Sequence, residues 1–225
     1  MNTSGNKQQI IRFVAGGSVT LFMVAIIVLT ATTLSRSVYY LLWGLPVIAV
    51  SLLDIYFLTR SLLQKPKTID LRLSSLIIGL GTTFGFSVAV MVLSPQHAAE
   101  GFSSEIRQMG MLLSLLPYPL VIWSLFCLGD CLTVVPEAHA VVAHGPYKFS
   151  RHPLYVCYMT WALANVLMFP TLPMLMAAVA QVLFLLIRLR REEALLLETF
   201  PEYRHYYERT GLFGPRVKRL ASIGD

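Results

Sequence analysis

The sequence predicts an all-α fold: a polytopic transmembrane helical bundle of about six spans, with both termini in the cytoplasm. Of the 225 residues, 56% are hydrophobic and only 13% are charged, whereas a soluble domain carries roughly a quarter charged residues. The apolar residues form long runs separated by short polar segments, and the lysines and arginines gather in alternate polar segments. These features exclude a disordered chain and an ordinary soluble enzyme.

The first four predicted spans are apolar runs long enough to cross a bilayer core of about 30 Å. The runs are Ile10–Leu34, Val38–Leu58, Ser75–Leu93 and Met109–Leu128. The first run is too long for the apolar core of a signal peptide, so we expect it to be retained as a span.

The last two predicted spans form a tight helical hairpin. Leu154–Phe169 and Leu172–Ile187 are apolar runs separated by Pro170, and proline interrupts a helix. The hairpin places the polar segment Gly129–Pro153 and the charged segment after Arg188 on the same side of the membrane. We expect the chemistry where these two segments converge.

The distribution of cations predicts the orientation. With a cytoplasmic N-terminus, sixteen of the 18 lysines and arginines lie inside, and only Arg36 and Arg107 lie outside. Cytoplasmic segments are enriched in these residues. We therefore expect the residues behind the net charge of +6 to face anionic lipid at the cytoplasmic surface, and we expect no nucleic-acid partner.

Two residue patterns inside or beside the apolar runs allow more than one interpretation. Cys127 and Cys131 stand four residues apart and, with His139 or His144, would offer metal ligands. Cysteines beside apolar helices are commonly inert, so we assign no metal site. Gly79, Gly81 and Gly85 imitate a nucleotide-binding pattern, but inside an apolar run they favour close helix packing.

Asp54 is the one acid well inside an apolar run. It precedes Arg60 by six residues, about 9 Å by helical rise. Intramembrane carboxylates face a partner or a wet cavity. An ion pair with Arg60 and a position facing the substrate both remain open.

The polar segment before the hairpin concentrates reactive side chains. Residues 144–155 read HGPYKFSRHPLY, which places two imidazoles, two tyrosines and Arg151 at one membrane-surface entrance. Pro153 suits the first position of the following helix. An interfacial loop anchored by tyrosines is the simpler alternative.

Glu192 and Glu193 place two carboxylates on the same side of the membrane as this polar segment. They are spaced for helix-surface ion pairs with Arg188 and Arg190. Combined with the loop, they would form a site for a zwitterionic or cationic small molecule.

These residues resemble a known family. RHPLY at 151–155, the hairpin and Glu192-Glu193 are similar to the signature of the isoprenylcysteine carboxyl methyltransferases and phospholipid methyltransferases. HGPY at 144–147 fits upstream, and Phe200, Tyr203, Tyr206, Arg209 and Pro215 fit downstream. The resemblance covers about Val134 to Pro215. Cys157 departs from it, because the family often has glycine there; its side chain would narrow a cofactor pocket or shift helix packing.

The resemblance implies an integral membrane methyltransferase that uses S-adenosylmethionine. It divides the chain into N-terminal transmembrane helices, residues 1–133, and a methyltransferase core, residues 134–225, with a cofactor-binding loop, the hairpin and a cytoplasmic tail. The implied catalytic cations, which would orient the acceptor, are Arg151 and Arg209. The implied cofactor-binding residues are His144, Gly145, Tyr147, His152, Tyr155, Glu192 and Glu193.

The implied acceptor is lipid-like or isoprenylated and reaches the site from the bilayer, and O-methylation of a carboxylate is favoured. A carboxylate needs no general base, whereas an amine must lose a proton, for which His152 or Glu193 would serve. The alternatives are a phospholipid amine N-methyltransferase, a membrane sterol reductase with a nicotinamide cofactor, and a non-enzymatic transporter or scaffold. The reductases have longer chains and a different tail motif.

Overall fold

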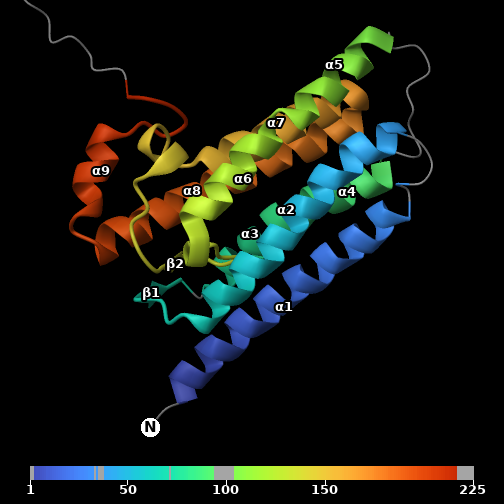
Figure 1. Cartoon of the computed structure of the whole chain (residues 1–225). Coiled ribbons are helices and arrows are strands. Elements are labelled where there is room, and N and C mark those ends of the chain that lie inside the picture. Colours follow the sequence, from blue (N-terminus) through green and yellow to red (C-terminus); the bar gives the residue numbers. More distant parts are fainter. Residues whose placement is uncertain (1–2, 33, 35–37, 71, 94–103, 217–225) are drawn as a thin grey trace, which may run out of the picture.

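The structure, a computed structural model, describes residues 3–32, 34, 38–70, 72–93 and 104–216. Arg36, which contributes to the predicted orientation, lies outside these ranges. The described chain is a bundle of long helices, with short strands and a small terminal helix gathered at one end (Figure 1). This confirms the predicted helical membrane fold.

The N-terminal half supplies four helices and one strand. They are α1 (Thr3–Ala31), α2 (Val38–Leu63), β1 (Thr68–Ile69), α3 (Leu73–Leu80) and α4 (Phe86–Leu93). A π-helical turn, Gly81–Gly85, joins α3 to α4, so the two helices form one continuous apolar segment.

The C-terminal half supplies the rest of the bundle. Its elements are α5 (Ser104–Leu115), α6 (Pro117–Leu128), β2 (Glu137–Ala138), α7 (Pro153–Met168), α8 (Leu172–Thr199) and α9 (Tyr203–Arg209). Short 3₁₀ turns lie at Gly129–Cys131 and Gly145–Lys148. Pro117 divides the predicted fourth span into α5 and α6, because proline cannot donate the next helical hydrogen bond.

Among the described residues, five helical segments are long and apolar enough to cross a membrane. They are Gln8–Ala31, Gly44–Leu63, Leu73–Leu93, Ser104–Cys131 and Leu172–Thr199. The remaining predicted span is α7, an apolar helix of 16 residues. Its length is about 24 Å by helical rise, which is shorter than a bilayer core of about 30 Å.

The predicted hairpin is present as α7 and α8, which pack against each other. Pro153 occupies the start of α7, as expected for a residue without an N–H. The hydroxyl of Thr171 caps α8 by accepting a hydrogen bond from the backbone N–H of Met174. α8 extends well beyond the apolar run that predicted it, and this extension carries Glu192 and Glu193.

The main core lies between α2, α6, α7 and α8. Its buried residues include Phe57, Val121, Leu125, Leu154 and Leu185. Large apolar side chains such as Leu21, Leu112 and Met176 are exposed on the outside of the bundle. A helix that is apolar on both its inner and outer faces suits a lipid environment.

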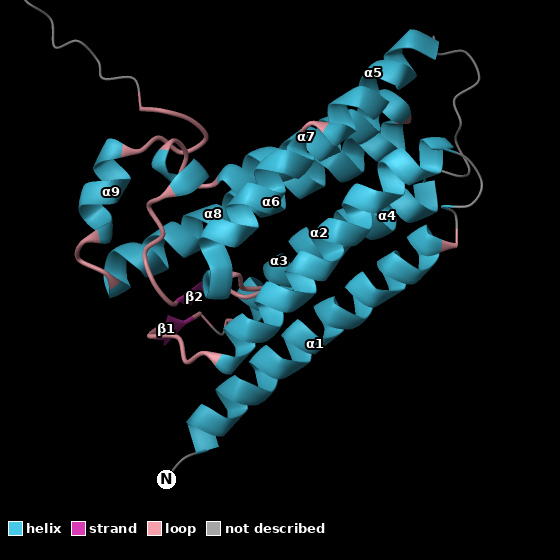
Figure 2. Ribbon diagram, in the orientation of Figure 1, coloured by secondary structure: helices cyan, strands magenta, loops and turns pink. Residues whose placement is uncertain are grey.

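A small antiparallel sheet, which the sequence analysis did not predict, ties the two halves together. Thr68 pairs with Ala138 and Ile69 pairs with Glu137. Figure 2 shows the two strands side by side at the same end of the bundle as α9. The sheet therefore fixes the loop before the 3₁₀ turn against the end of α2.

Candidate active site

The charged end of α8 meets the loop before α7 through Glu193. The Arg151 Nε donates to Glu193 Oε1 at 2.7 Å, and the His152 Nε2 lies 3.2 Å from the same oxygen. All three side chains are largely buried. The predicted partner of Glu193 on its own helix was Arg190; the structure instead uses Arg151, which the tertiary fold brings to it.

Arg151 also binds the tail of the chain. Its NH1 donates to the carbonyl oxygens of Tyr207 and Thr210 at 2.7 and 2.6 Å, and its guanidinium lies 4.0 Å from the centre of the Tyr207 ring. Two backbone N–H groups, of Arg151 and His152, donate to the carbonyls of Gly211 and Leu212. The loop, α9 and the segment after it therefore form one packed unit.

Glu192 forms a second cluster one residue before Glu193. The hydroxyl of Tyr155 donates to Glu192 Oε2 at 2.6 Å, and the Arg188 Nε donates to Glu192 Oε1 at 2.8 Å. The predicted Arg188–Glu192 ion pair is thus present. Arg188 reaches further, to the hydroxyl of Thr82 and the carbonyl of Thr133.

The π-helical turn is part of this cluster. Such turns leave backbone groups without their usual helical partners and recur at functional sites. The carbonyl of Thr82 accepts a hydrogen bond from Gln181 Nε2 at 3.1 Å, while its hydroxyl accepts from Arg188. Polar groups of two predicted spans thereby satisfy one another inside the bundle.

One cavity of about 950 Å³ connects these groups with the interior of the bundle. Of the predicted site residues, the cavity is lined by Tyr147, Arg151, His152, Tyr155 and Glu192. Glu193 is not among the lining residues, but it holds Arg151 and His152, which are. Further in, the walls become mostly apolar and come from α1, α2 and α4.

Besides Glu193, three predicted site residues lie outside the cavity lining. His144 is exposed at the start of the 3₁₀ turn. Gly145 has a φ of 59°, which favours glycine, and a side chain there would collide with Cys127. Arg209 is exposed on α9, with NH1 3.0 Å from His205 Nε2.

The tyrosines near the polar end are held in the neutral form. Burial raises the pKa of Tyr206 to about 12 and that of Tyr147 well above its usual value. The Tyr206 hydroxyl donates to the carbonyl of Tyr147 at 2.6 Å. Because Tyr206 keeps its proton at neutral pH, this bond fixes α9 against the 3₁₀ turn.

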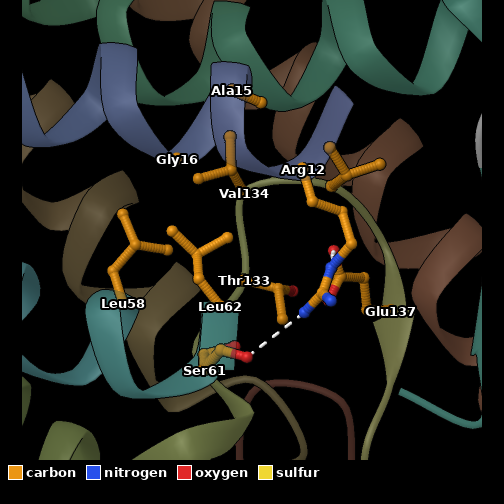
Figure 3. A pocket seen from close by; sticks show the side chains of 10 residues that line it. Arg12, Ala15, Gly16, Leu58, Ser61, Leu62, Thr133, Val134 and Glu137 are labelled. Carbon is orange, nitrogen blue, oxygen red and sulfur yellow. Dashed lines mark hydrogen bonds and ion pairs between the residues drawn. The ribbon is translucent and has the colours of Figure 1, made fainter. Parts of the chain in front are cut away.

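A separate cluster around Glu137 supports the wall of the cavity. Arg12 donates to Glu137 Oε1 at 2.8 Å, and its other nitrogens donate to the carbonyls of Ser61 and Gln64. Figure 3 shows the Arg12 guanidinium between the carboxylate and Ser61. Glu137 also lies 2.9 Å from His139 Nε2, and both residues line the large cavity.

Sequence reasoning did not assign several of the residues that build this region. Arg188 was treated only as a helix-surface partner, and Tyr158, Gln181, Thr82 and the Arg12–Glu137 pair were not assigned. Two signals were available: aromatic residues at three-residue spacing in Tyr155, Tyr158 and Trp161, which share a helix face, and polar residues inside apolar runs, which need partners.

The remaining features flagged from the sequence have structural roles. Cys157 is buried against α6, with Sγ 3.8 Å from the Pro117 carbonyl, and it does not line the cavity. Gly79 packs against the backbone of Val134, which leaves no room for a side chain. Within the described part of the chain, no group of three or more His, Cys, Asp or Glu side chains could hold a metal ion.

Part of the chain matches one protein-family model. Residues 110–198 match the model of the isoprenylcysteine carboxyl methyltransferase (ICMT) family. The match runs from α5 to the end of α8 and contains the polar loop and both glutamates. The tail residues after Glu198 lie outside it.

Two curated relatives match a shorter segment. The cobalt-zinc-cadmium resistance protein CzcN of Cupriavidus metallidurans is 37% identical over 82 residues, which are 35% of this chain and 37% of that protein. The nickel-cobalt-cadmium resistance protein NccN of Alcaligenes xylosoxydans xylosoxydans is 36% identical over 85 residues, 36% of this chain and 39% of that protein. The chain therefore spans less than two fifths of the length of either relative.

Among solved structures, that of the eukaryotic intramembrane Ras methyltransferase ICMT superposes with a TM-score of 0.49 at 19% sequence identity. The superposition covers 94% of this chain and 86% of that one. The segment that matches the family model also holds the RHPLY loop, the helical hairpin and the paired glutamates. Over residues 110–198, this chain is isoprenylcysteine carboxyl methyltransferase-like.

Proposed function

We propose that this protein is an integral membrane methyltransferase that transfers a methyl group from S-adenosylmethionine to an amphipathic, lipid-like acceptor. The observation that carries the proposal is a cavity of about 950 Å³ with a polar end at Glu192 and an apolar end among the membrane helices. Ligand sites range from about 300 to 1,000 Å³. This volume suits two ligands that meet inside the bundle.

The residues at the polar end fit the proposed cofactor. A carboxylate such as Glu192 attracts an ammonium or a sulfonium, and the rings of Tyr147 and Tyr155 offer apolar faces beside it. Arg188 offers a guanidinium to a carboxylate on the same ligand. When bound, S-adenosylmethionine supplies a methyl group that its sulfonium already activates.

The protein's own contribution is then binding, orientation and exclusion of water. Glu193 fixes His152 and Arg151, and the tail segment held by Arg151 closes the polar end. A carboxylate acceptor needs no base. For an amine acceptor, His152 is the residue suited to accept a proton, because Glu193 orients its ring through the 3.2 Å contact.

In this proposal the two domains have different roles. Residues 1–133 would supply the apolar wall through which the acceptor enters, and residues 134–225 would supply the cofactor loop, the hairpin and the tail. The active site would face the cytoplasm, where the cofactor is available. Carboxylate O-methylation and amine N-methylation remain the two candidate reactions.

Equilibrium binding of S-adenosylmethionine to the purified protein in a neutral detergent tests the proposal. Glu192→Gln keeps the size of the side chain but removes its charge. We expect at least tenfold weaker binding, equivalent to about 1.4 kcal/mol. Glu198→Gln is the matched control, because Glu198 is exposed on the same helix and does not line the cavity.

Unchanged affinity in Glu192→Gln would contradict the proposed cofactor site. Binding of a nicotinamide cofactor in place of S-adenosylmethionine would favour the reductase alternative. Binding of neither would leave a transporter or scaffold. If S-adenosylmethionine does bind, a methylation screen with membrane lipid extracts identifies the acceptor.

A further inference from the structure

Asp54 lies in the wall of the cavity, on α2, one helical turn after Ser51, which lines the same cavity. Of the two roles that the sequence left open, the ion pair with Arg60 is absent. Arg60 instead binds Asp130, with Nε 2.9 Å from Oδ1 and NH2 2.9 Å from Oδ2. Among the residues that the structure describes, none forms a hydrogen bond or an ion pair with Asp54.

The other charged groups of the cavity wall are already paired. Arg151 binds Glu193, Arg188 binds Glu192, and Glu137 binds Arg12. Both arginines of the wall are therefore already held by carboxylates of the described chain, and Arg209 lies outside the cavity lining. The one wall charge without an ionic partner in the described structure is an acid, which attracts a cation strongly where water is scarce.

An aromatic ladder runs along the face of α7 that lines the cavity. The rings of Tyr155 and Tyr158 are 6.3 Å apart, and those of Tyr158 and Trp161 are 5.9 Å apart. Tyr118 of α6 continues the ladder, 5.2 Å from Trp161. All four line the same cavity as Asp54. Aromatic faces combined with an acid are a recurring arrangement for binding ammonium groups.

Apart from these groups, the cavity wall is mostly apolar. α1 and α4 contribute Phe22, Met23, Ile26, Phe86 and Val90. Such a wall accommodates a hydrocarbon chain, since burying apolar surface is favourable. The cavity lining thus combines a polar end, an acid with aromatic rings, and an apolar region.

We propose that Asp54, Tyr158 and Trp161 form a subsite for the ammonium head of an amphiphile whose apolar chain lies against α1 and α4. If the amphiphile is the methyl acceptor, the inference rests on the proposed function and assigns that acceptor to the amines or aminolipids. The ammonium group of the cofactor is the other source of the same chemistry. The experiment separates the two.

The probe is octylammonium, titrated into the purified full chain in a neutral maltoside detergent and followed by tryptophan fluorescence, with octanol as the uncharged probe. We expect Asp54→Asn to weaken octylammonium binding at least tenfold and to leave octanol binding unchanged. Asp54→Glu should retain octylammonium binding within a few-fold. Asp130→Asn, the same change at an acid outside the cavity lining, should alter neither affinity.

The outcomes that overturn the subsite are distinct. They are absence of octylammonium binding to the parent protein, equal binding in Asp54→Asn, or an equal loss of octylammonium and octanol binding. If Asp54→Asn also weakens S-adenosylmethionine binding tenfold, Asp54 serves the cofactor and the proposed acceptor subsite fails. Failure of the parent protein to bind S-adenosylmethionine would overturn the proposed function, while the octylammonium result would still decide the role of Asp54.

Melting temperatures provide the folding control. Asp54→Asn removes a partly buried charge without breaking any ion pair or hydrogen bond within the described chain, so we expect a melting temperature equal to or above that of the parent. A weakened octylammonium affinity in a variant of unchanged stability assigns the effect to the subsite.

Discussion

Arg151 illustrates how one residue can link the loop before α7 to the tail. It forms an ion pair with Glu193 and donates to two backbone carbonyls, and a lysine has neither the planar fork nor the number of donors to replace all three contacts. The resemblance to the methyltransferases assigned Arg151 to the acceptor. The contacts in the structure give it a positioning role as well.

We predict that Arg151→Lys costs about 1–3 kcal/mol of stability, because buried carbonyls lose their donor. The melting temperature should fall, and α9 should become accessible to protease. Turnover should fall more than S-adenosylmethionine binding, because the charge survives while the orientation is lost. Arg204→Lys is the control, since its pair with Glu208 is exposed and worth little. Equal collapse of turnover and cofactor binding would place Arg151 in the cofactor pocket instead.

At the scale of elements, the segment from α3 to α4 depends on one close approach. Gly79 lies directly against the carbonyl of Val134, in the loop that leads to β2, whereas a Cβ at Gly85 would meet no atom within 4 Å. The glycines that imitate a nucleotide-binding pattern therefore differ in function along one apolar segment. Only some of them are required by packing.

We predict that Gly79→Ala destabilises the protein by about 1–3 kcal/mol, since the loop backbone must move to admit a methyl group. Gly85→Ala should be neutral or stabilising by up to about 1 kcal/mol, because alanine is the better helix former. Thermal unfolding in detergent compares the two variants. Equal melting temperatures would show that the backbone around Val134 moves to admit the methyl group at no cost in stability.

The hairpin shows what an apolar pattern can and cannot specify. Its two arms and the turn at Pro170 are as predicted, because proline and the apolar runs are local signals. α8 continues as a helix through Arg190 and Glu193, as their helix-surface spacing predicted, and ends at Thr199. The packing of α9 and the loop onto this extension is a tertiary effect. It makes Arg151 and His152 the partners of Glu193.

For the whole molecule, the orientation in the membrane stays a prediction from the cation distribution. Reporter fusions in the segment 94–103, which lies outside the described residues, and at the C-terminus should report opposite sides, with the C-terminus in the cytoplasm. Two reporters on the same side would contradict both the orientation and the proposed cytoplasmic active site.

The sequence by itself determined the class of this protein. Low charge and long apolar runs specify a helical membrane bundle because the bilayer requires every backbone group to be bonded within the chain. The ordered residues from Arg151 to Glu193 specified the family resemblance. The position of Pro153 at the start of α7 also followed, since it depends on local geometry.

Only the tertiary structure decided which charged residues pair across the bundle. Arg151 with Glu193, Arg12 with Glu137 and Arg60 with Asp130 join residues 42, 125 and 70 positions apart, so no local spacing predicts them. The cavity and the unpaired Asp54 depend on the same long-range packing. In an apolar interior each charge must find a partner, a water or a ligand, and which of these it finds depends on how the helices pack in three dimensions.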